Sequence, residues 1–206
     1  MKRNKSWLII GSFLIIVGIG LIGYDYYSNK AINDDEDIAI AEFYENEETT
    51  EDIIEEPTEE KPKEEKKEEK INYIAVLKIP KIKLVRGLVD RNSYLNNIKY
   101  NVEILKDSSM PDEVNGNVIL AAHSGNARIS YFRNLDKLKL GDEISIEYKS
   151  KTYEYKIVDI YLIEKTGTAE IIRNKDKSTL TLITCKHNTN KQIIVIAELI
   201  WNNLGI

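Results

Sequence analysis

This chain of 206 residues contains one cysteine, Cys185, so no disulfide can form within it. Basic charge is not in excess either: the formal net charge is -5, which gives no support to nucleic-acid binding. No glycine-rich phosphate loop of the usual spacing is present. Thiol and imidazole ligands are scarce, and a zinc site of Cys185, His187 and His123 would have an unusual Cys-x-His spacing and no evident fourth ligand. We therefore predict no cofactor and no metal among the site residues.

Charge is absent from the run WLIIGSFLIIVGIGLIG, residues 7–23, which follows a basic start. A helix of roughly 17 to 25 apolar residues crosses a bilayer, and basic flanking residues stay in the cytoplasm. A cleavable signal peptide is the alternative, but its apolar core is usually shorter and a small-residue cleavage site should follow. Here the tyrosine-rich YDYYSNK follows, as at a membrane interface. We predict a cytoplasmic N-terminus at 1–6, an uncleaved transmembrane signal anchor at 7–27, and the rest of the chain outside the cell membrane.

Glu, Asp and Lys dominate residues 28–71. Such a segment buries too little apolar surface to offset its conformational entropy, so we predict an acidic, mostly disordered stalk. Glu and Lys blocks in it favour short stretches of single helix through pairs four residues apart. An acidic protein-binding tail is the alternative, but a spacer is the simpler interpretation. The folded domain is then expected at 72–206.

The domain has a mostly β pattern, with short alternating runs separated by Gly, Asn, Asp and Lys turns. This pattern is typical of a closed barrel or a sandwich. The expected strands lie in YIAVLKIPKIKL, broken at Pro80, and in GNVILAAH, DEISIEY, TYEYKIVDIYLIE, TLTLITC and QIIVIAELI. Helical turns are expected in RNSYLNNIKYNVEIL and YFRNLDKL.

Cys185 and His123 each end one of these expected strands. Strand alternation places Ile183 and Cys185 on one face of TLTLITC, and Leu182 and Thr184 on the other. A strand end beside a loop is where a scaffold exposes a reactive side chain. A thiol becomes a useful nucleophile when an imidazole favours its thiolate, and that imidazole can later donate a proton to a leaving amine.

Structural explanations of both residues stay open at this point. A lone cysteine in an apolar strand is usually a small buried hydrophobe, and a histidine at a strand end is usually a structural group. In an exported protein an unpaired cysteine is therefore either buried or reactive. His187 is a second possible partner of Cys185, although it enters the polar turn KHNTNK and ranks below His123.

The segment TLITC resembles the TLxTC signature of sortases, the membrane-anchored cysteine transpeptidases of Gram-positive bacteria. Four further segments are similar to sortase patterns in the same order, and together they span residues 73–200. These are IAVLKIPKIKL, GNVILAAHSG, YFRNLDKLKLGDEISI and IIVIAELI.

This resemblance implies an eight-stranded, mostly antiparallel, closed β-barrel with short helices. It also implies that Cys185 is the nucleophile and His123 the general acid/base. The family cleaves an LPxTG-like sorting signal between Thr and Gly through a thioacyl enzyme. An amine of a cell-wall precursor or a pilin lysine then accepts the surface protein. Both the substrate and the acceptor would lie at the outer face of the membrane.

One position departs from the family pattern. Sortases usually carry an arginine at the start of the strand after the cysteine loop, where this chain has Gln192 with Lys191 beside it. Gln192 can donate a neutral hydrogen bond to a developing oxyanion, but it lacks the charge and the two-pronged geometry of a guanidinium. Arg128 and Lys191 are the candidates to compensate, and an inactive, non-catalytic sortase-like binding module tethered to the membrane is the alternative function. A cysteine peptidase that only hydrolyses is a third.

The sequence narrows the subclass without assigning it. No Asp-Pro-aromatic tripeptide, typical of a pilus-sortase lid, precedes residue 73. The segment KTGTAEIIRNKDKS is too short for the long helix of class B enzymes. Its Glu170 and Asp176 resemble a calcium loop of some relatives, but acids with Lys and Arg between them are more often a solvated turn.

Overall fold

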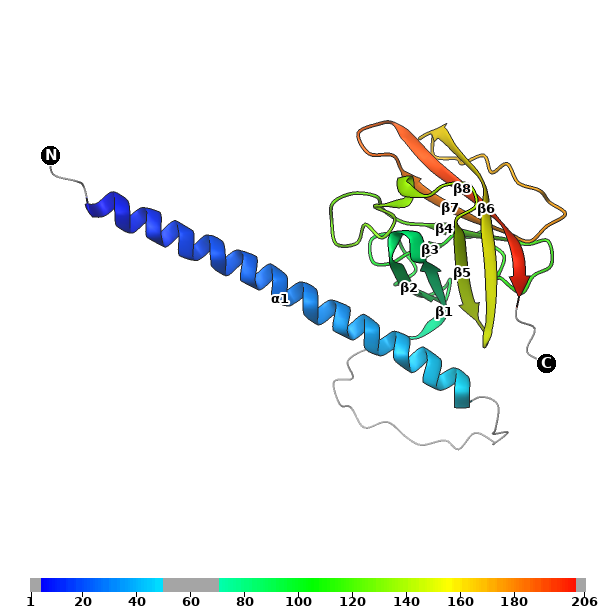
Figure 1. Ribbon diagram of the computed structural model, residues 1–206, viewed down its shortest axis with the longest axis horizontal. Coiled ribbons are helices and arrows are strands. Elements are labelled where there is room, and N and C mark those ends of the chain that lie inside the picture. Colours follow the sequence, from blue (N-terminus) through cyan, green and yellow to red (C-terminus); the bar gives the residue numbers. More distant parts are fainter. Residues whose placement is uncertain (1–4, 50–70, 203–206) are drawn as a thin grey trace. The chain divides into compact units, whose positions relative to one another are not determined.

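The computed structural model describes residues 5–49 and 71–202, and the chain divides after residue 38 into two compact units. One helix precedes eight strands and two short 3-10 helices (Figure 1). In chain order the elements are α1 (Lys5–Thr49), β1 (Tyr73–Ile79), η1 (Pro80–Ile82), β2 (Leu84–Val89), β3 (Glu103–Ile104), β4 (Asn117–Ala121), η2 (Leu135–Lys137), β5 (Glu143–Tyr148), β6 (Lys151–Glu164), β7 (Thr179–Cys185) and β8 (Lys191–Asn202).

The strands form one sheet in the order β2-β1-β5-β6-β8-β7-β4-β3. Only the β4–β7 pair is parallel among the described strands. The sheet curls into a nearly closed barrel with β2 and β3 as its two edges, so the prediction of a mainly β barrel is confirmed and full closure is not. We call the gap between the two edges the barrel seam. There the buried Asn101 amide donates to the Gly87 carbonyl at 3.0 Å and accepts from Arg86 Nε at 2.6 Å. Side-chain bonds thus join the two edges where the backbone ladder is missing.

Alternating residues give β4, β7 and β8 two apolar faces. The inner face contributes Leu120, Leu182 and Val195 to the main core of the barrel. The outer face forms a second cluster of Ile119, Ile183, Ile194 and Ile196, with Ala169 and Ile171 packed against it from the segment between β6 and β7. This outer face matters for function because it also carries the residues at the strand ends.

The expected strands are all present, and of the segment expected to form helical turns, residues 91–105, Glu103–Ile104 form strand β3 instead. Residues 91–102 form successive turns, because side-chain oxygens take the backbone N–H groups that a helix would use. Asp90 accepts from the Asn92 N–H at 2.8 Å, and Asn97 accepts from the Lys99 N–H at 3.0 Å. The other expected turn, YFRNLDKL, contains η2.

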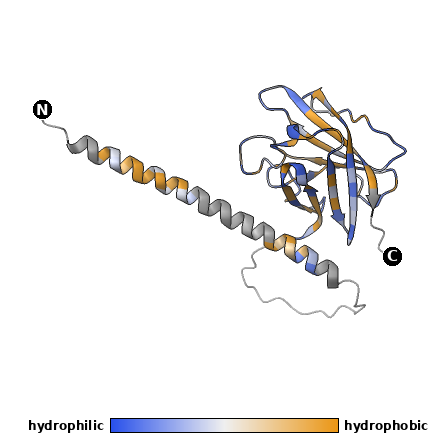
Figure 2. Ribbon diagram, viewed as in Figure 1, coloured by the Kyte–Doolittle hydropathy of each residue, from blue (hydrophilic) through white to orange (hydrophobic). Residues whose placement is uncertain are grey.

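The N-terminal region differs from the expected stalk. Helix α1 continues to Thr49, and Ala39, Ile40 and Phe43 are buried in one cluster with strand residues of the barrel. The strand residues are Tyr73, Val76 and Val89. Figure 2 colours the described parts of α1 by hydropathy: the first part is mostly hydrophobic, and the second has both hydrophobic and hydrophilic residues. An apolar spacing inside an acidic segment explains the difference, since residues three and four apart share a helix face.

Two further predictions concern this region, the membrane span and the remainder of the stalk. Among the residues that the structure describes, no helix combines the length and the apolar character needed to cross a membrane. The remainder of the predicted stalk, residues 50–70, lies outside the described residues.

Candidate active site

The ends of three adjacent strands, β4, β7 and β8, bring the candidate residues together. In the parallel β4–β7 pair Ala121 lies opposite Ile183. The Ala122 N–H then donates to the Ile183 carbonyl at 3.3 Å, which carries the pairing one residue further. Extended by two residues beyond Ala121 and Ile183, the same register would bring His123 level with Cys185. In the antiparallel β7–β8 pair, Cys185 lies opposite Gln192.

All three side chains belong to the outer face of the barrel. Ala121, Ile183 and Ile194 pack in the outer cluster, and each stands two residues from its partner at the strand end. Strand alternation therefore gives His123, Cys185 and Gln192 the same outward direction, on strands about 4.8 Å apart. All three are partly exposed, so the predicted strand faces are confirmed and Cys185 is not a fully buried hydrophobe.

Hydrogen bonds fix the backbone on both sides of His123. The Thr184 hydroxyl donates to the Ala122 carbonyl at 2.7 Å, and the Ser124 hydroxyl donates to the Cys185 carbonyl. The His123 carbonyl itself accepts from the Phe132 N–H at 3.0 Å. The imidazole is thus presented from a backbone held at three successive residues.

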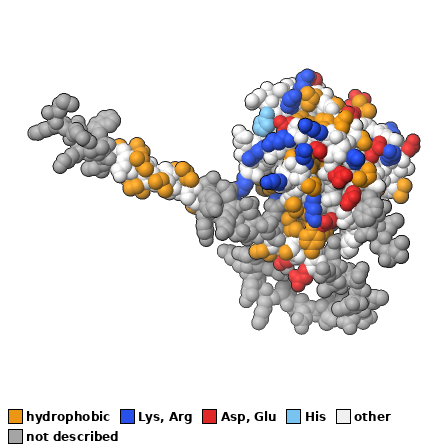
Figure 3. Space-filling view, viewed as in Figure 1, with side chains coloured by type: hydrophobic (Ala, Val, Ile, Leu, Met, Phe, Trp, Pro, Cys, Tyr) orange, Lys and Arg blue, Asp and Glu red, His pale blue; other side chains and the backbone are white. Residues whose placement is uncertain are grey.

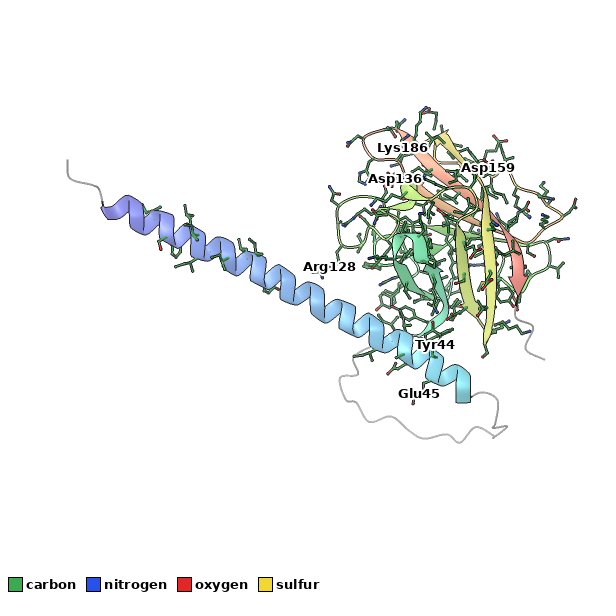
Figure 4. The ribbon with its side chains drawn as sticks, viewed as in Figure 1. Tyr44, Glu45, Arg128, Asp136, Asp159 and Lys186 are labelled. Atoms are coloured by element: carbon green, nitrogen blue, oxygen red, sulfur yellow. The ribbon has the colours of Figure 1, made fainter. Side chains whose placement is uncertain are left out.

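The loop after His123 is shaped by one arginine. The Arg133 guanidinium donates to the carbonyls of Gly125, Asn126 and Ala127 at 2.9 to 3.2 Å. Arg128 is exposed on this loop, and in Figure 4 it points away from the strands. The structure therefore does not bring Arg128 toward Gln192.

Lys191 and His187 also lie apart from the three strand-end residues. Lys191 pairs with Glu164 across β6 and β8, with 3.4 Å between Nζ and Oε1, and alternation turns it to the opposite face from Gln192. His187 is exposed in the β7–β8 turn, which the Lys186 N–H closes by donating to the Lys191 carbonyl. In the space-filling view a histidine lies at the surface with Lys and Arg side chains nearby (Figure 3).

The segment between β6 and β7 covers the outer cluster beside Cys185. It contains no helix from 165 to 178, in agreement with the prediction from its length. The Tyr161 hydroxyl holds it by donating to the Glu170 carbonyl at 3.1 Å and accepting from the Ile172 N–H at 2.8 Å. Burial is the main cause that raises the pKa of Tyr161.

Neither suggested metal site is assembled within the part of the chain that the structure describes, where no group of three or more His, Cys, Asp and Glu side chains lies together. Cys185, His187 and His123 do not form a zinc set, and Glu170 and Asp176 gain no third acidic partner.

Sequence reasoning missed Ser124, Thr184 and Tyr161. The signal for the first two was present, since a hydroxyl residue follows His123 and another precedes Cys185. Only the strand pairing reveals that these hydroxyls cross from one strand end to the other. For Tyr161 the sequence carries no such signal, because its bonds reach a loop of irregular structure.

Known proteins resemble this chain in sequence and in fold. The family model described as Sortase domain matches residues 77–200. Sortase D of Bacillus subtilis (strain 168) is 31% identical over 110 residues, covering 53% of this chain and 52% of that protein. Sortase A of Listeria monocytogenes is 33% identical over 86 residues, covering 41% of this chain and 38% of that protein. These alignments thus span about half or less of the curated relatives.

Solved structures agree with the fold. A Clostridium perfringens Sortase D5 transpeptidase superposes with a TM-score of 0.57 and 27% identity, covering 82% of this chain and 99% of that chain. Sortase A from Corynebacterium diphtheriae, a lid mutant, gives a TM-score of 0.56 at 23% identity, covering 63% of this chain and 70% of that chain. The family model matches more than half of the chain, and the nearly closed eight-stranded barrel agrees with it, so this chain belongs to the sortase family.

Proposed function

We propose that the protein is a cysteine transpeptidase of the sortase type, with Cys185 as nucleophile and His123 as general acid/base. One observation carries this proposal: β4, β7 and β8 are paired neighbours, Cys185 lies opposite Gln192, and His123 follows the Ala121–Ile183 pair by two residues. Neighbouring strands lie about 4.8 Å apart, a separation from which a thiol and an imidazole can approach each other for proton transfer. Partial exposure of both leaves room for a peptide.

The proposed substrate is a surface protein with an LPxTG-like sorting signal. The Cys185 thiolate attacks the Thr carbonyl carbon, forming a C–S bond and a tetrahedral oxyanion. The oxyanion collapses and breaks the Thr–Gly C–N bond, while protonated His123 gives its proton to the leaving amine. An acceptor amine, from a cell-wall precursor or a pilin lysine, then attacks the thioester, loses a proton to His123 and releases the thiolate.

Gln192 is the proposed oxyanion donor. It lies opposite Cys185 on β8, whereas Lys191 is engaged with Glu164 and Arg128 is exposed on its loop. Oxyanion-hole donors in other enzymes include neutral side-chain amides, and removing one costs roughly 10²- to 10³-fold in kcat. A neutral amide is therefore chemically adequate in the place where the family usually has arginine.

We also propose that residues 7–27 anchor the protein in the cell membrane, with the N-terminus in the cytoplasm and the barrel outside. The support is the uncharged run after a basic start. Its test is fractionation of cells that express the full chain, followed by protease added to intact cells. Barrel fragments released from a membrane-bound protein are expected, and a protein recovered without membranes would contradict the anchor.

The function is tested with the full chain in detergent, a library of LPxTG-like peptides and triglycine as the amine. Mass spectrometry is expected to find peptides cleaved after Thr and joined to triglycine, and an acyl adduct on Cys185. Cys185→Ala and His123→Ala should abolish both products, whereas Ser108→Ala, a buried hydroxyl on another part of the barrel, should not. Cleavage without joined amine would indicate a hydrolytic peptidase. No adduct on a folded protein would favour the non-catalytic binding module.

A further inference from the structure

The β4–β7 backbone ladder ends just before the two proposed catalytic residues. Its last pair is Ala121 with Ile183, followed by the single bond from the Ala122 N–H to the Ile183 carbonyl at 3.3 Å. Beyond that point no described backbone bond joins His123 to Cys185. The separation of the two residues must therefore be set by other contacts.

Two hydroxyls continue the pairing where the ladder stops. Thr184, just before Cys185, donates to the carbonyl of Ala122, just before His123. Ser124, just after His123, donates in the opposite direction across the gap, to the carbonyl of Cys185. Both hydroxyls are buried, with 3% of Thr184 and 6% of Ser124 exposed, so water does not readily replace either bond.

Of the two, the Ser124 bond is the one that ends on Cys185 itself. Because Ser124 is bonded covalently to His123, this hydroxyl links the backbone of the imidazole directly to the backbone of the thiol. We propose that Ser124 is a positioning residue, whose hydroxyl holds the Cys185 carbonyl and keeps the thiol level with the imidazole. The catalytic role of Ser124 rests on the proposed function, whereas its structural role rests only on the hydrogen bond to Cys185.

The test compares wild type with Ser124→Ala, Ser124→Thr, His123→Ala and Ser108→Ala in the full chain. Ser108 is the control because it is also 6% exposed and its hydroxyl also donates to a backbone carbonyl, that of Ser109, while it accepts from the Ile119 N–H within β4. The first readout is the pH profile of Cys185 alkylation by iodoacetamide, which needs no substrate. The second is kcat and KM with a cleaved peptide and triglycine.

Ser124→Ala is expected to lower kcat by about 10- to 100-fold, the effect of a small misplacement of reacting groups, while KM changes by less than about twofold. Its alkylation profile should move toward that of His123→Ala, because the thiol loses its imidazole neighbour. Ser124→Thr keeps the hydroxyl and should return kcat to within about threefold of wild type. Ser108→Ala should lower the melting temperature without moving either readout.

Alkylation and kinetics that are the same in Ser124→Ala as in Ser108→Ala would overturn the proposal. So would a Ser124→Thr protein that is as impaired as Ser124→Ala. If Ser124→Ala fails to fold, Ser124→Cys replaces it, since a thiol fills the site but donates a weak hydrogen bond. Its kcat and its alkylation profile should shift in the same direction, by a smaller amount. Failure of the proposed function is distinguishable: wild type would then transfer no peptide, while the alkylation profiles would still differ between Ser124→Ala and Ser108→Ala.

Discussion

Gln192 and Cys185 form the last antiparallel pair of β7 and β8 before the turn that joins the two strands. Paired residues share a sheet face, so the amide lies on the same side as the thiol. Its own strand neighbour Lys191 instead bonds with Glu164. The polar group nearest the nucleophile on β8 is thus neutral, in a family that usually places a cation there.

Replacing Gln192 by Ala should lower kcat for peptide transfer by about 100-fold, because one oxyanion donor is lost. Lys191→Ala is the matched comparison and should change kcat by less than about threefold, since an exposed ion pair contributes little. Steady-state kinetics with one cleaved peptide measure both. Equal losses in the two variants would contradict the assignment of Gln192. Gln192→Arg should keep at least wild-type kcat if the amide occupies the usual arginine position.

We expect the Asn101 side chain to contribute more to the free energy of unfolding than any other side-chain amide described at the barrel seam. It bonds to the Gly87 carbonyl, Arg86 Nε and the Val102 N–H, and it is 3% exposed. Asn101→Ala is expected to lower the free energy of unfolding by about 3 kcal/mol, because it leaves buried polar groups unpaired. Urea unfolding measures this loss. Asn126→Ala, at an exposed position, should change it by less than about 0.5 kcal/mol, and a similar loss in both would refute the role of the seam.

The strands were predictable because alternation is a local property. The face of Cys185 followed from TLTLITC alone, and Ile183 indeed packs outside while Leu182 packs inside. The neighbour of Cys185 was not predictable from the residues themselves, because β4 and β7 are far apart in the chain and only their pairing sets His123 beside it. The resemblance of GNVILAAHSG and TLITC to sortase segments suggested that relation instead.

In the N-terminal region the acidic composition outweighed the apolar spacing in our prediction. Ala39, Ile40 and Phe43 have helical apolar spacing, but the acidic residues around them favour a solvated segment. Tertiary burial against β1 decides that case. Residues 91–102 form turns but no regular helix, since the Asp90 and Asn97 side chains compete with helical bonds for backbone N–H groups.

Tyr161→Phe should loosen the segment between β6 and β7 without destabilising the barrel. The hydroxyl makes two bonds to that segment, and the ring stays packed in the outer cluster when the oxygen is removed. We expect amide hydrogen exchange at 169–173 to become about tenfold faster, which corresponds to roughly 1.4 kcal/mol, and the melting temperature to change by less than about 3 °C. Tyr100→Phe, on an exposed turn, is the control. Unchanged exchange at 169–173 would show that apolar packing alone holds the segment.

The packing of the α1 end on the barrel should weaken at alkaline pH. Tyr44 donates to Glu147, which also pairs with Lys78 at 2.5 Å between Nζ and Oε1, and Figure 4 shows Tyr44 on the side of the helix facing the strands. Burial, followed by the bond to Glu147, raises the pKa of Tyr44. Burial lowers the pKa of Lys78, but its bonds to Glu147 and Tyr44 outweigh that effect and raise it.

The raised pKa values of Tyr44 and Lys78 affect the pH dependence of stability in the same direction. A raised pKa means that the folded state keeps its proton to higher pH than the unfolded state, whose tyrosine and lysine titrate at about 10 to 10.4. The stabilisation is therefore complete below about pH 10 and is lost as the pH rises through the folded values. Tyr44→Phe removes the donor, so it should be less stable than wild type by about 1 kcal/mol at pH 7, and this gap should narrow above pH 10. Urea unfolding of both proteins from pH 7 to 11.5 measures the gap. A gap that stays constant across that range would contradict the linkage to the raised pKa. No gap at any pH would mean that Tyr44 contributes through its ring, which the variant keeps, and through its contact with Phe43, and not through its hydroxyl.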